Sequence, residues 1–120
     1  MVRPHKQLMV WQESMALVEQ VYLLTASFPG DERFGLISQL RRAAVSIPSN
    51  IAEGAARRSS KEYLQFLAMA RGSLSEMDTQ LELSARLGFI ADDHAVFRQM
   101  DQTGRLLSAL IVSIRNKIQS

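Results

Sequence analysis

Apolar residues recur along most of this chain at alternating intervals of three and four positions. This spacing places side chains on one face of an α-helix, and no stretch shows the strict alternation that is typical of a β-strand. Turn-forming or helix-capping residues interrupt the pattern at three places: the tetrapeptide FPGD at 28–31, the pair Ser59-Ser60, and the segment from Gly88 to Asp93. We therefore predict four helices, over residues 8–27, 33–57, 60–87 and 92–118.

One apolar seam runs along each predicted helix. The seams consist of Val10, Ser14, Leu17, Val21, Leu24 and Phe28 in the first helix, Ile37, Leu40, Ala44, Ile47 and Ile51 in the second, Tyr63, Leu67, Ala70, Leu74, Met77 and Leu81 in the third, and Val96, Met100, Thr103, Leu107, Leu110 and Ile114 in the fourth. The short connections favour antiparallel neighbours. We predict an all-α protein in which residues 1–120 form a single domain, an antiparallel up-down-up-down four-helix bundle.

Pro48 falls inside the second predicted helix, where its ring and its missing N–H disturb the helical hydrogen bonds. In the interpretation that we adopt for the fold, the helix continues with a kink. The carbonyl of Ala44, which loses its helical partner, then accepts a hydrogen bond from water or from the hydroxyl of Ser46 or Ser49. In the other interpretation, Ser46 caps a new helix that has Pro48 in its first turn. The second interpretation creates a helix-turn-helix, so the path of the chain at Pro48 separates two functional hypotheses.

Small side chains are concentrated in the second and third predicted helices. Helix propensity accounts for the alanines, but Gly54 and Gly72 each cost a helix about 1 kcal/mol relative to alanine. Close backbone contact between the two helices would compensate for this cost. We therefore expect both glycines to lie at a tight contact between these helices.

The composition suits one domain with one core, since 47% of the 120 residues are hydrophobic. The absence of cysteine excludes disulfides and thiolate metal sites and fits a reducing compartment. No apolar run approaches the roughly 20 residues of a membrane span, and the segment MVRPHKQLMVWQES does not resemble a signal peptide. We expect a cytoplasmic protein without a membrane partner.

The net charge is only +2, but the charges are distributed unevenly. Residues 33–71 contain seven basic and two acidic side chains, whereas residues 72–101 contain six acidic side chains and two arginines. The basic part can attract nucleic-acid phosphates, although the same asymmetry can make copies of the chain attract one another. The candidate phosphate contacts are Arg41, Arg42, Arg57, Arg58, Lys61 and Arg71. Three of them gather near the start of the third helix, whose N-terminal N–H groups favour anions.

Signatures of catalysis and of cofactor binding are absent from the sequence. Neither His5 nor His94 follows a glutamate by three positions, the spacing of di-iron bundles, and we expect both at the surface. No histidine is near a plausible serine nucleophile, and there is no glycine-rich phosphate loop. We expect no catalytic residue, no metal and no cofactor. Phe34 and Phe66 fit core or cap positions, which leaves Tyr63 as the one aromatic residue of the basic region, and without stacking platforms sequence-specific base recognition is unsupported.

The most specific part of the sequence is GLISQLRRAAVSIPSNIAEGAARRS, preceded by WQESMALVEQVY and followed by FLAMARGSLSEMDTQLELSARLG. On these segments the chain resembles the four-helix-bundle proteins of the 23S ribosomal-RNA intervening-sequence family, over roughly residues 8–118. The resemblance implies a ring-shaped homo-oligomer, with a pentamer expected, and an association with nucleic acid. It implies no chemical reaction.

These observations predict a non-enzymatic, oligomeric bundle that contacts RNA or DNA phosphates through its basic second helix and the turn at 57–61. Two alternatives remain open. A helix-turn-helix DNA-binding protein would use residues 47–58 as its recognition helix, with base contacts from Ser49, Asn50, Glu53 and Arg57. A protein-interaction scaffold would instead set the acidic face of one copy against the basic face of another and bind no nucleic acid.

Overall fold

Four α-helices make up most of the structure, a computed structural model that describes residues 3–119. They are α1 (Met9–Thr25), α2 (Leu36–Ala55), α3 (Ser60–Arg86) and α4 (Ala95–Gln119). Two short 3-10 helices, η1 (Pro4–Gln7) and η2 (Gly30–Glu32), precede α1 and α2. The described range contains no strand, and each α-helix begins and ends within three residues of the predicted bounds. The prediction of an all-α protein with four helices is confirmed.

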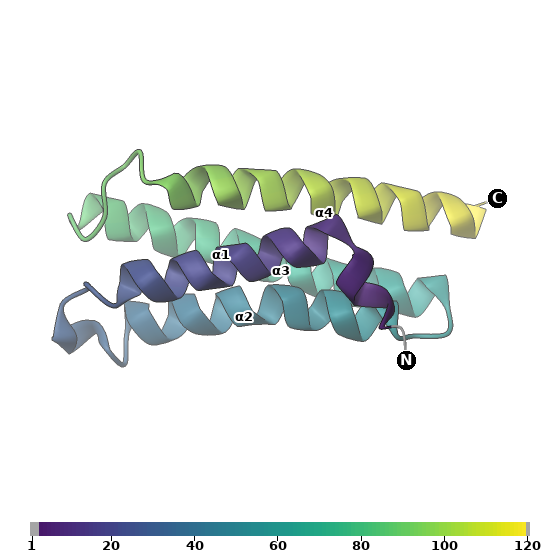
Figure 1. The fold of residues 1–120 in the computed structure, drawn as a ribbon, viewed down its shortest axis with the longest axis horizontal. Helices are drawn as coiled ribbons and strands as arrows, with labels where there is room; N and C mark the ends of the chain where they lie inside the picture. The colour runs from purple at the N-terminus through teal and green to yellow at the C-terminus, as the bar shows by residue number, and fades with distance from the viewer. Residues whose placement is uncertain (1–2, 120) are drawn as a thin grey trace.

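Consecutive α-helices run in opposite directions along the length of the molecule (Figure 1). Each helix has two neighbours, because α1 and α3 both pack against α2 and α4. The result is an elongated bundle with extents of 49 × 26 × 20 Å. The turns that join the helices therefore lie at the two ends of the bundle, and the α2–α3 turn shares its end with the N-terminus and the C-terminus (Figure 1).

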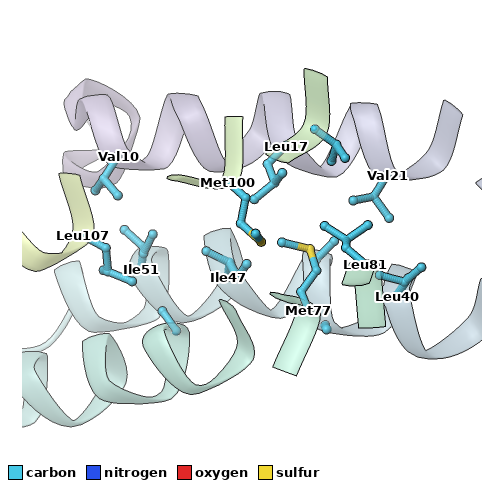
Figure 2. Close-up of a cluster of buried hydrophobic side chains, with 14 of the residues drawn as sticks. Val10, Leu17, Val21, Leu40, Ile47, Ile51, Met77, Leu81, Met100 and Leu107 are labelled. Carbon is cyan, nitrogen blue, oxygen red and sulfur yellow. The ribbon is translucent and has the colours of Figure 1, made fainter. Parts of the chain in front are cut away.

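The predicted seams meet along the axis of the bundle. Figure 2 shows Leu17, Ile47, Met77 and Met100, one from each α-helix, converging on the same part of the core. These side chains are at most 6% exposed, and burial of each stabilises the fold by about 1.5–3 kcal/mol. Four predicted seam residues are only partly buried: Ile37, Tyr63, Leu74 and Leu110. The core also includes Ile111, which the seam pattern did not predict.

Four small hydroxyl side chains lie in this apolar core, and each donates a hydrogen bond to a carbonyl of the preceding turn of its own helix. The bonds are 2.8 Å for Ser14 to Trp11, 2.6 Å for Thr25 to Val21, 2.8 Å for Ser84 to Gln80 and 2.8 Å for Thr103 to Gln99. A buried hydroxyl without such a partner would carry a desolvation cost. The local bonds explain why these polar residues can occupy buried positions.

The beginning and end of α3 follow the predicted signals. The Ser59 hydroxyl accepts a hydrogen bond of 3.2 Å from the Glu62 N–H and donates one of 3.2 Å to the Glu62 carboxylate, which satisfies an N–H of the first turn. Gly88 follows the helix with a φ of 82°, a conformation that favours glycine. Helix capping therefore fixes both ends of α3.

The start of α4 differs from the prediction. We expected the helix to begin at residue 92, within the capping segment that ends at Asp93, but it begins only at Ala95. The imidazole Nδ1 of His94 instead accepts a hydrogen bond of 3.0 Å from the N–H of Val96. His94 lies in the loop before α4, where we expected it, but it is partly buried and its side chain caps the helix.

The helix α2 continues through Pro48 without a break. Ser46 does not cap a new helix, because its hydroxyl lies 2.8 Å from the Ser73 hydroxyl on α3. The Ser49 hydroxyl donates a hydrogen bond of 2.7 Å to the carbonyl of Val45. We had expected such a bond to the carbonyl of Ala44, the preceding residue. A continuous α2 has no turn at this point, so the helix-turn-helix hypothesis loses its structural basis. The kink at Pro48 stays a prediction.

The two glycines of the expected α2–α3 contact have different surroundings. A Cβ placed on Gly54 would lie 2.9 Å from the Cβ of Phe66 and 2.9 Å from a ring carbon of Tyr63, so α2 and α3 approach closely there. Gly72 is exposed, and a Cβ placed on it would meet no atom within 4 Å. The close contact is confirmed at Gly54, and the expectation for Gly72 was wrong.

Substitution of each glycine by alanine should change stability in opposite directions. Gly54→Ala should lower the free energy of unfolding by about 1–3 kcal/mol, because the new methyl group overpacks the contact with Phe66 and Tyr63. Gly72→Ala should raise it by up to about 1 kcal/mol, because alanine favours the helix and meets open space. Urea denaturation of the two variants measures both changes. A stability loss in Gly72→Ala that equals the loss in Gly54→Ala would contradict this account.

Candidate nucleic-acid interface

The six predicted phosphate contacts do not form one surface. Arg57 and Arg58 lie in the turn between α2 and α3, and Lys61 lies in the first turn of α3. Arg41 stands 16 residues before Arg57, a separation of about 24 Å at the rise of an α-helix. The candidates therefore divide into a group at the α2–α3 turn, a pair in the first half of α2, and Arg71 on α3.

In the α2–α3 turn, the side chain of Arg57 is engaged in contacts within the fold. Its guanidinium lies 2.6 Å from a carboxylate oxygen of Glu53, and it stacks over Phe66 with 4.7 Å to the ring centroid. The glutamate compensates the charge of Arg57, and the aromatic ring restricts the orientation of its planar head group. Arg57 therefore adds less to the local positive potential than its charge suggests.

Arg58 and Lys61 are the basic residues near the turn whose charged groups are free to contact a ligand. Both side chains are exposed, and within residues 3–119 neither has an ion pair or hydrogen bond to another residue. They flank the N-terminus of α3, where the helix dipole favours a negative charge. The arrangement leaves two unpaired positive charges on an exposed corner of the bundle.

Tyr63, the aromatic residue of the basic region, does not present its ring to solvent. It lies half-buried against Gly54, and burial raises the pKa of its hydroxyl above the ordinary value of 10.0. The Phe66 ring packs against the Arg57 guanidinium. The sequence did not predict this contact, because we expected Phe66 at a core or cap position. The turn therefore offers charge to a ligand rather than a platform for stacked bases.

Arg41 connects α2 to the end of α1. Its Nε donates a hydrogen bond of 2.9 Å to the hydroxyl of Thr25, and a terminal nitrogen donates one of 3.4 Å to the carbonyl of Tyr22. The guanidinium also stands 4.6 Å from the centroid of the Tyr22 ring. Arg42, by contrast, is exposed and has no such partner among the described residues. Of the pair, only Arg42 keeps its donors free for a ligand.

Arg71 lines a hollow between α3 and α4, which we call the α3/α4 groove. This groove has a volume of about 550 Å³ and is lined by Arg71, Leu74, Ser75, Asp78, Met100, Asp101, Gly104, Arg105 and Ser108. Two aspartates share it with two arginines. The two aspartates would repel phosphate groups, so the groove is unlike the α2–α3 turn in its charge. Arg71 therefore differs from the cations of that turn both in position and in the charge around it.

An apolar hollow of about 320 Å³, which we call the α1/α2 groove, lies between the first two α-helices. It is lined by His5, Trp11, Met15, Val18, Val45, Pro48, Ser49 and Ala52. Met15 is 38% exposed and Val45 is 41% exposed, and neither belongs to the predicted seams. An exposed apolar strip of this kind is typical of a protein–protein contact.

Residues 3–119 were searched for clusters of metal ligands and for helices that could span a membrane. No three histidine, aspartate or glutamate side chains in this range come close enough to share a metal ion. None of the helices there is both long and apolar enough to span a bilayer.

Four antiparallel helices that each pack against two neighbours place the chain in the class of small four-helix-bundle proteins. Within that class, the family model described as "23S rRNA-intervening sequence protein" matches residues 6–111 of this chain. The chain therefore belongs to this family. No curated protein matches it significantly.

Arg41 should contribute to stability, whereas its neighbour Arg42 should not. Arg41→Gln removes hydrogen bonds to α1 and the stacking on Tyr22, so we expect the free energy of unfolding to fall by about 1–2 kcal/mol. Arg42→Gln changes an exposed side chain without a partner and should stay within about 0.5 kcal/mol. Thermal and urea denaturation of the two variants test this contrast. Equal losses would show that the Arg41 contacts contribute nothing specific.

Proposed function

We propose that this protein is a non-enzymatic, self-associating helical bundle that binds RNA phosphates through its α2–α3 turn. The observation that carries the proposal is the pair Arg58 and Lys61, two exposed cations without partners among the described residues, beside the N-terminus of α3. Phosphate groups meet both the side-chain charges and the helix dipole at such a site. Arg57 in the same turn and Arg42 on α2 have supporting roles.

RNA is favoured over DNA by the family to which the chain belongs. The family description refers to an intervening sequence of 23S rRNA. No groove-reading helix is available, since α2 continues through Pro48, and the basic turn carries no exposed aromatic ring. We therefore propose a contact that follows the RNA backbone and discriminates little between base sequences.

RNA affinity should depend on salt and on the two free cations. We expect log K for random RNA to fall with log salt at a slope of about −0.7 to −0.9 for each phosphate contact. Arg58→Gln/Lys61→Gln should weaken binding and reduce the slope by about two contacts. Filter binding or fluorescence anisotropy over a range of salt concentrations measures both quantities.

The matched control is Arg98→Gln/Arg115→Gln, which removes the same charge from exposed positions on α4. This control should retain the salt slope of the wild type. Equal weakening in both double variants would indicate a diffuse effect of net charge, and the α2–α3 turn would lose its role. Absence of RNA binding at physiological salt would favour the protein-interaction scaffold instead.

Self-association is the second part of the proposal, and the α1/α2 groove supports it. Its apolar side chains, Met15 and Val45 among them, would be removed from water in a contact between copies. A ring of five copies is the assembly that we propose, and its mass would be five times the 13.5 kDa of the single chain. The contact around such a ring joins two different surfaces, so the α1/α2 groove would receive another face of the next copy.

Charge in the α1/α2 groove should reduce the mass of the assembly. Met15→Glu/Val45→Glu places carboxylates where apolar side chains would be buried, so light scattering at micromolar concentration should show fewer chains per particle than in the wild type. The matched control is Leu23→Glu/Leu83→Glu, which alters two exposed leucines outside the groove. An unchanged mass for the groove variant would remove this surface from the assembly.

A further inference from the structure

Phe34 is the most exposed of the large apolar side chains in residues 3–119. It is 86% exposed and lies in the turn between η2 and α2, at the end of the bundle opposite the α2–α3 turn (Figure 1). The guanidinium of Arg33 stands 5.1 Å from the centroid of its ring. An aromatic side chain can bury about 150–250 Å² in a packed contact. Within one chain, most of this area stays in water.

The backbone around Phe34 is held in place by hydrogen bonds. The N–H of Arg33 donates a bond of 3.2 Å to the carbonyl of Gly30. The carboxylate of Glu32 accepts a bond of 3.2 Å from the N–H of Leu36, at the start of α2. An aromatic side chain on a turn that is already ordered loses little conformational freedom when it enters a pocket. The fold therefore presents the ring in a form that suits binding.

The α1/α2 groove has the size and the lining that a single aromatic ring requires. Its volume of about 320 Å³ lies near the lower end of the range of about 300–1,000 Å³ for ligand pockets, so it suits one side chain better than a whole helix. Trp11, Met15 and Pro48 are among the residues that line it. An indole ring and a thioether both make favourable contacts with the edge of another aromatic ring.

Phe34 cannot fill the α1/α2 groove of its own chain. Val45 is the groove residue nearest to it in the sequence, and α2 covers about 14 Å between Leu36 and Val45. The turn that carries the ring stands beyond the ends of α1 and α2 (Figure 1). The ring and the groove can therefore meet only between two copies of the chain.

Opposite charges accompany the ring and the groove. Arg33 precedes Phe34, and Glu19 follows Met15 by four residues on α1, which makes these two side chains neighbours on the helix surface. Arg33 and Glu19 are both exposed, and neither has an ion pair or a hydrogen bond to another side chain of 3–119. The surface with the ring and the surface with the groove are thus complementary in charge as well as in shape.

We infer that Phe34 of one copy inserts into the α1/α2 groove of the next copy, where Arg33 faces Glu19 at the rim. The contact joins two different surfaces, so every copy offers one ring and one groove, and repetition can close an assembly with an odd number of chains, five included. An aromatic anchor in an apolar pocket commonly carries much of the energy of an interface. The inference rests on the self-association proposed above and names the surface that enters the groove.

Removal of the ring tests the contact. Phe34→Ser alters a side chain that the single chain leaves in water, so the fold should persist, and light scattering at micromolar concentration should show fewer chains per particle than in the wild type. The matched control is Val112→Ser, which changes an exposed apolar side chain of α4 outside the groove. This control should retain the wild-type mass.

The same measurement separates this inference from the proposed function. If Phe34→Ser keeps the wild-type mass while Met15→Glu/Val45→Glu loses it, the groove belongs to the assembly but receives another surface, and the inference is overturned. If both variants keep the wild-type mass, the groove has no role, and the inference fails together with the proposed ring contact.

A mixture of the two variants tests whether the contact joins different surfaces. Phe34→Ser retains the groove, and Met15→Glu/Val45→Glu retains the ring. Neither should assemble alone, but an equimolar mixture should form particles of two chains, with twice the mass of 13.5 kDa, through the one intact contact. Sedimentation equilibrium from micromolar to millimolar concentration measures these masses. A mixture that is no heavier than its components overturns the inference.

Charge exchange in this two-chain particle tests the rim. Glu19→Arg in the chain with the groove, or Arg33→Glu in the chain with the ring, should raise the dissociation constant about two- to fivefold, the range for an exposed ion pair. The two changes together should return it to the value of the unmodified pair, because the charges are then opposite again. Losses that simply add would contradict the placement of Arg33 opposite Glu19.

Discussion

The position of the basic turn depends on the close approach of α2 and α3 at Gly54. Only a hydrogen atom fits between α2 and the side chains of Phe66 and Tyr63, so the end of α2 lies directly on the first turns of α3. The chain must then reverse within a few residues. The same contact brings Phe66 beneath Arg57 and leaves Arg58 and Lys61 facing water. A packing constraint inside the bundle thus determines which charges are available outside it.

The count of basic residues in the sequence does not reveal which of them are engaged in contacts within the fold. Arg41 and Arg57 both stack on aromatic rings, and each makes further contacts within the fold. Guanidinium groups suit such positions because they are planar and remain weakly hydrated. Among the described residues of 33–71, the basic side chains without an ion pair, hydrogen bond or ring contact are Arg42, Arg58, Lys61 and Arg71. A ligand would meet fewer charges than the seven basic residues of 33–71 suggest.

The sequence predicted the helices and their seams well, because the spacing of apolar residues depends only on helical geometry. It was less successful where an outcome depends on which neighbour a side chain meets. Gly54 and Gly72 look alike in the sequence, yet one faces α3 closely and the other faces open space. Phe34 was assigned to a core or cap position but is 86% exposed, with Arg33 stacked on it.

The candidate site shows the same division between local and tertiary information. The clustering of Arg57, Arg58 and Lys61 at a helix junction followed from the capping signal at Ser59-Ser60, which is local. The separation of Arg41 and Arg71 from that cluster could not be predicted, because it arises from contacts with α1 and α4. Tertiary neighbours, rather than the charge pattern, decide which arginines act together.

The starts of α3 and α4 are held by caps of different kinds. The Ser59 hydroxyl exchanges two hydrogen bonds with Glu62, as acceptor from its N–H and as donor to its carboxylate. His94 makes one cap bond at α4, in which Nδ1 accepts the N–H of Val96. A side chain without an acceptor at position 94 would therefore leave that N–H unpaired and loosen the first turn of α4, while α3 keeps its cap.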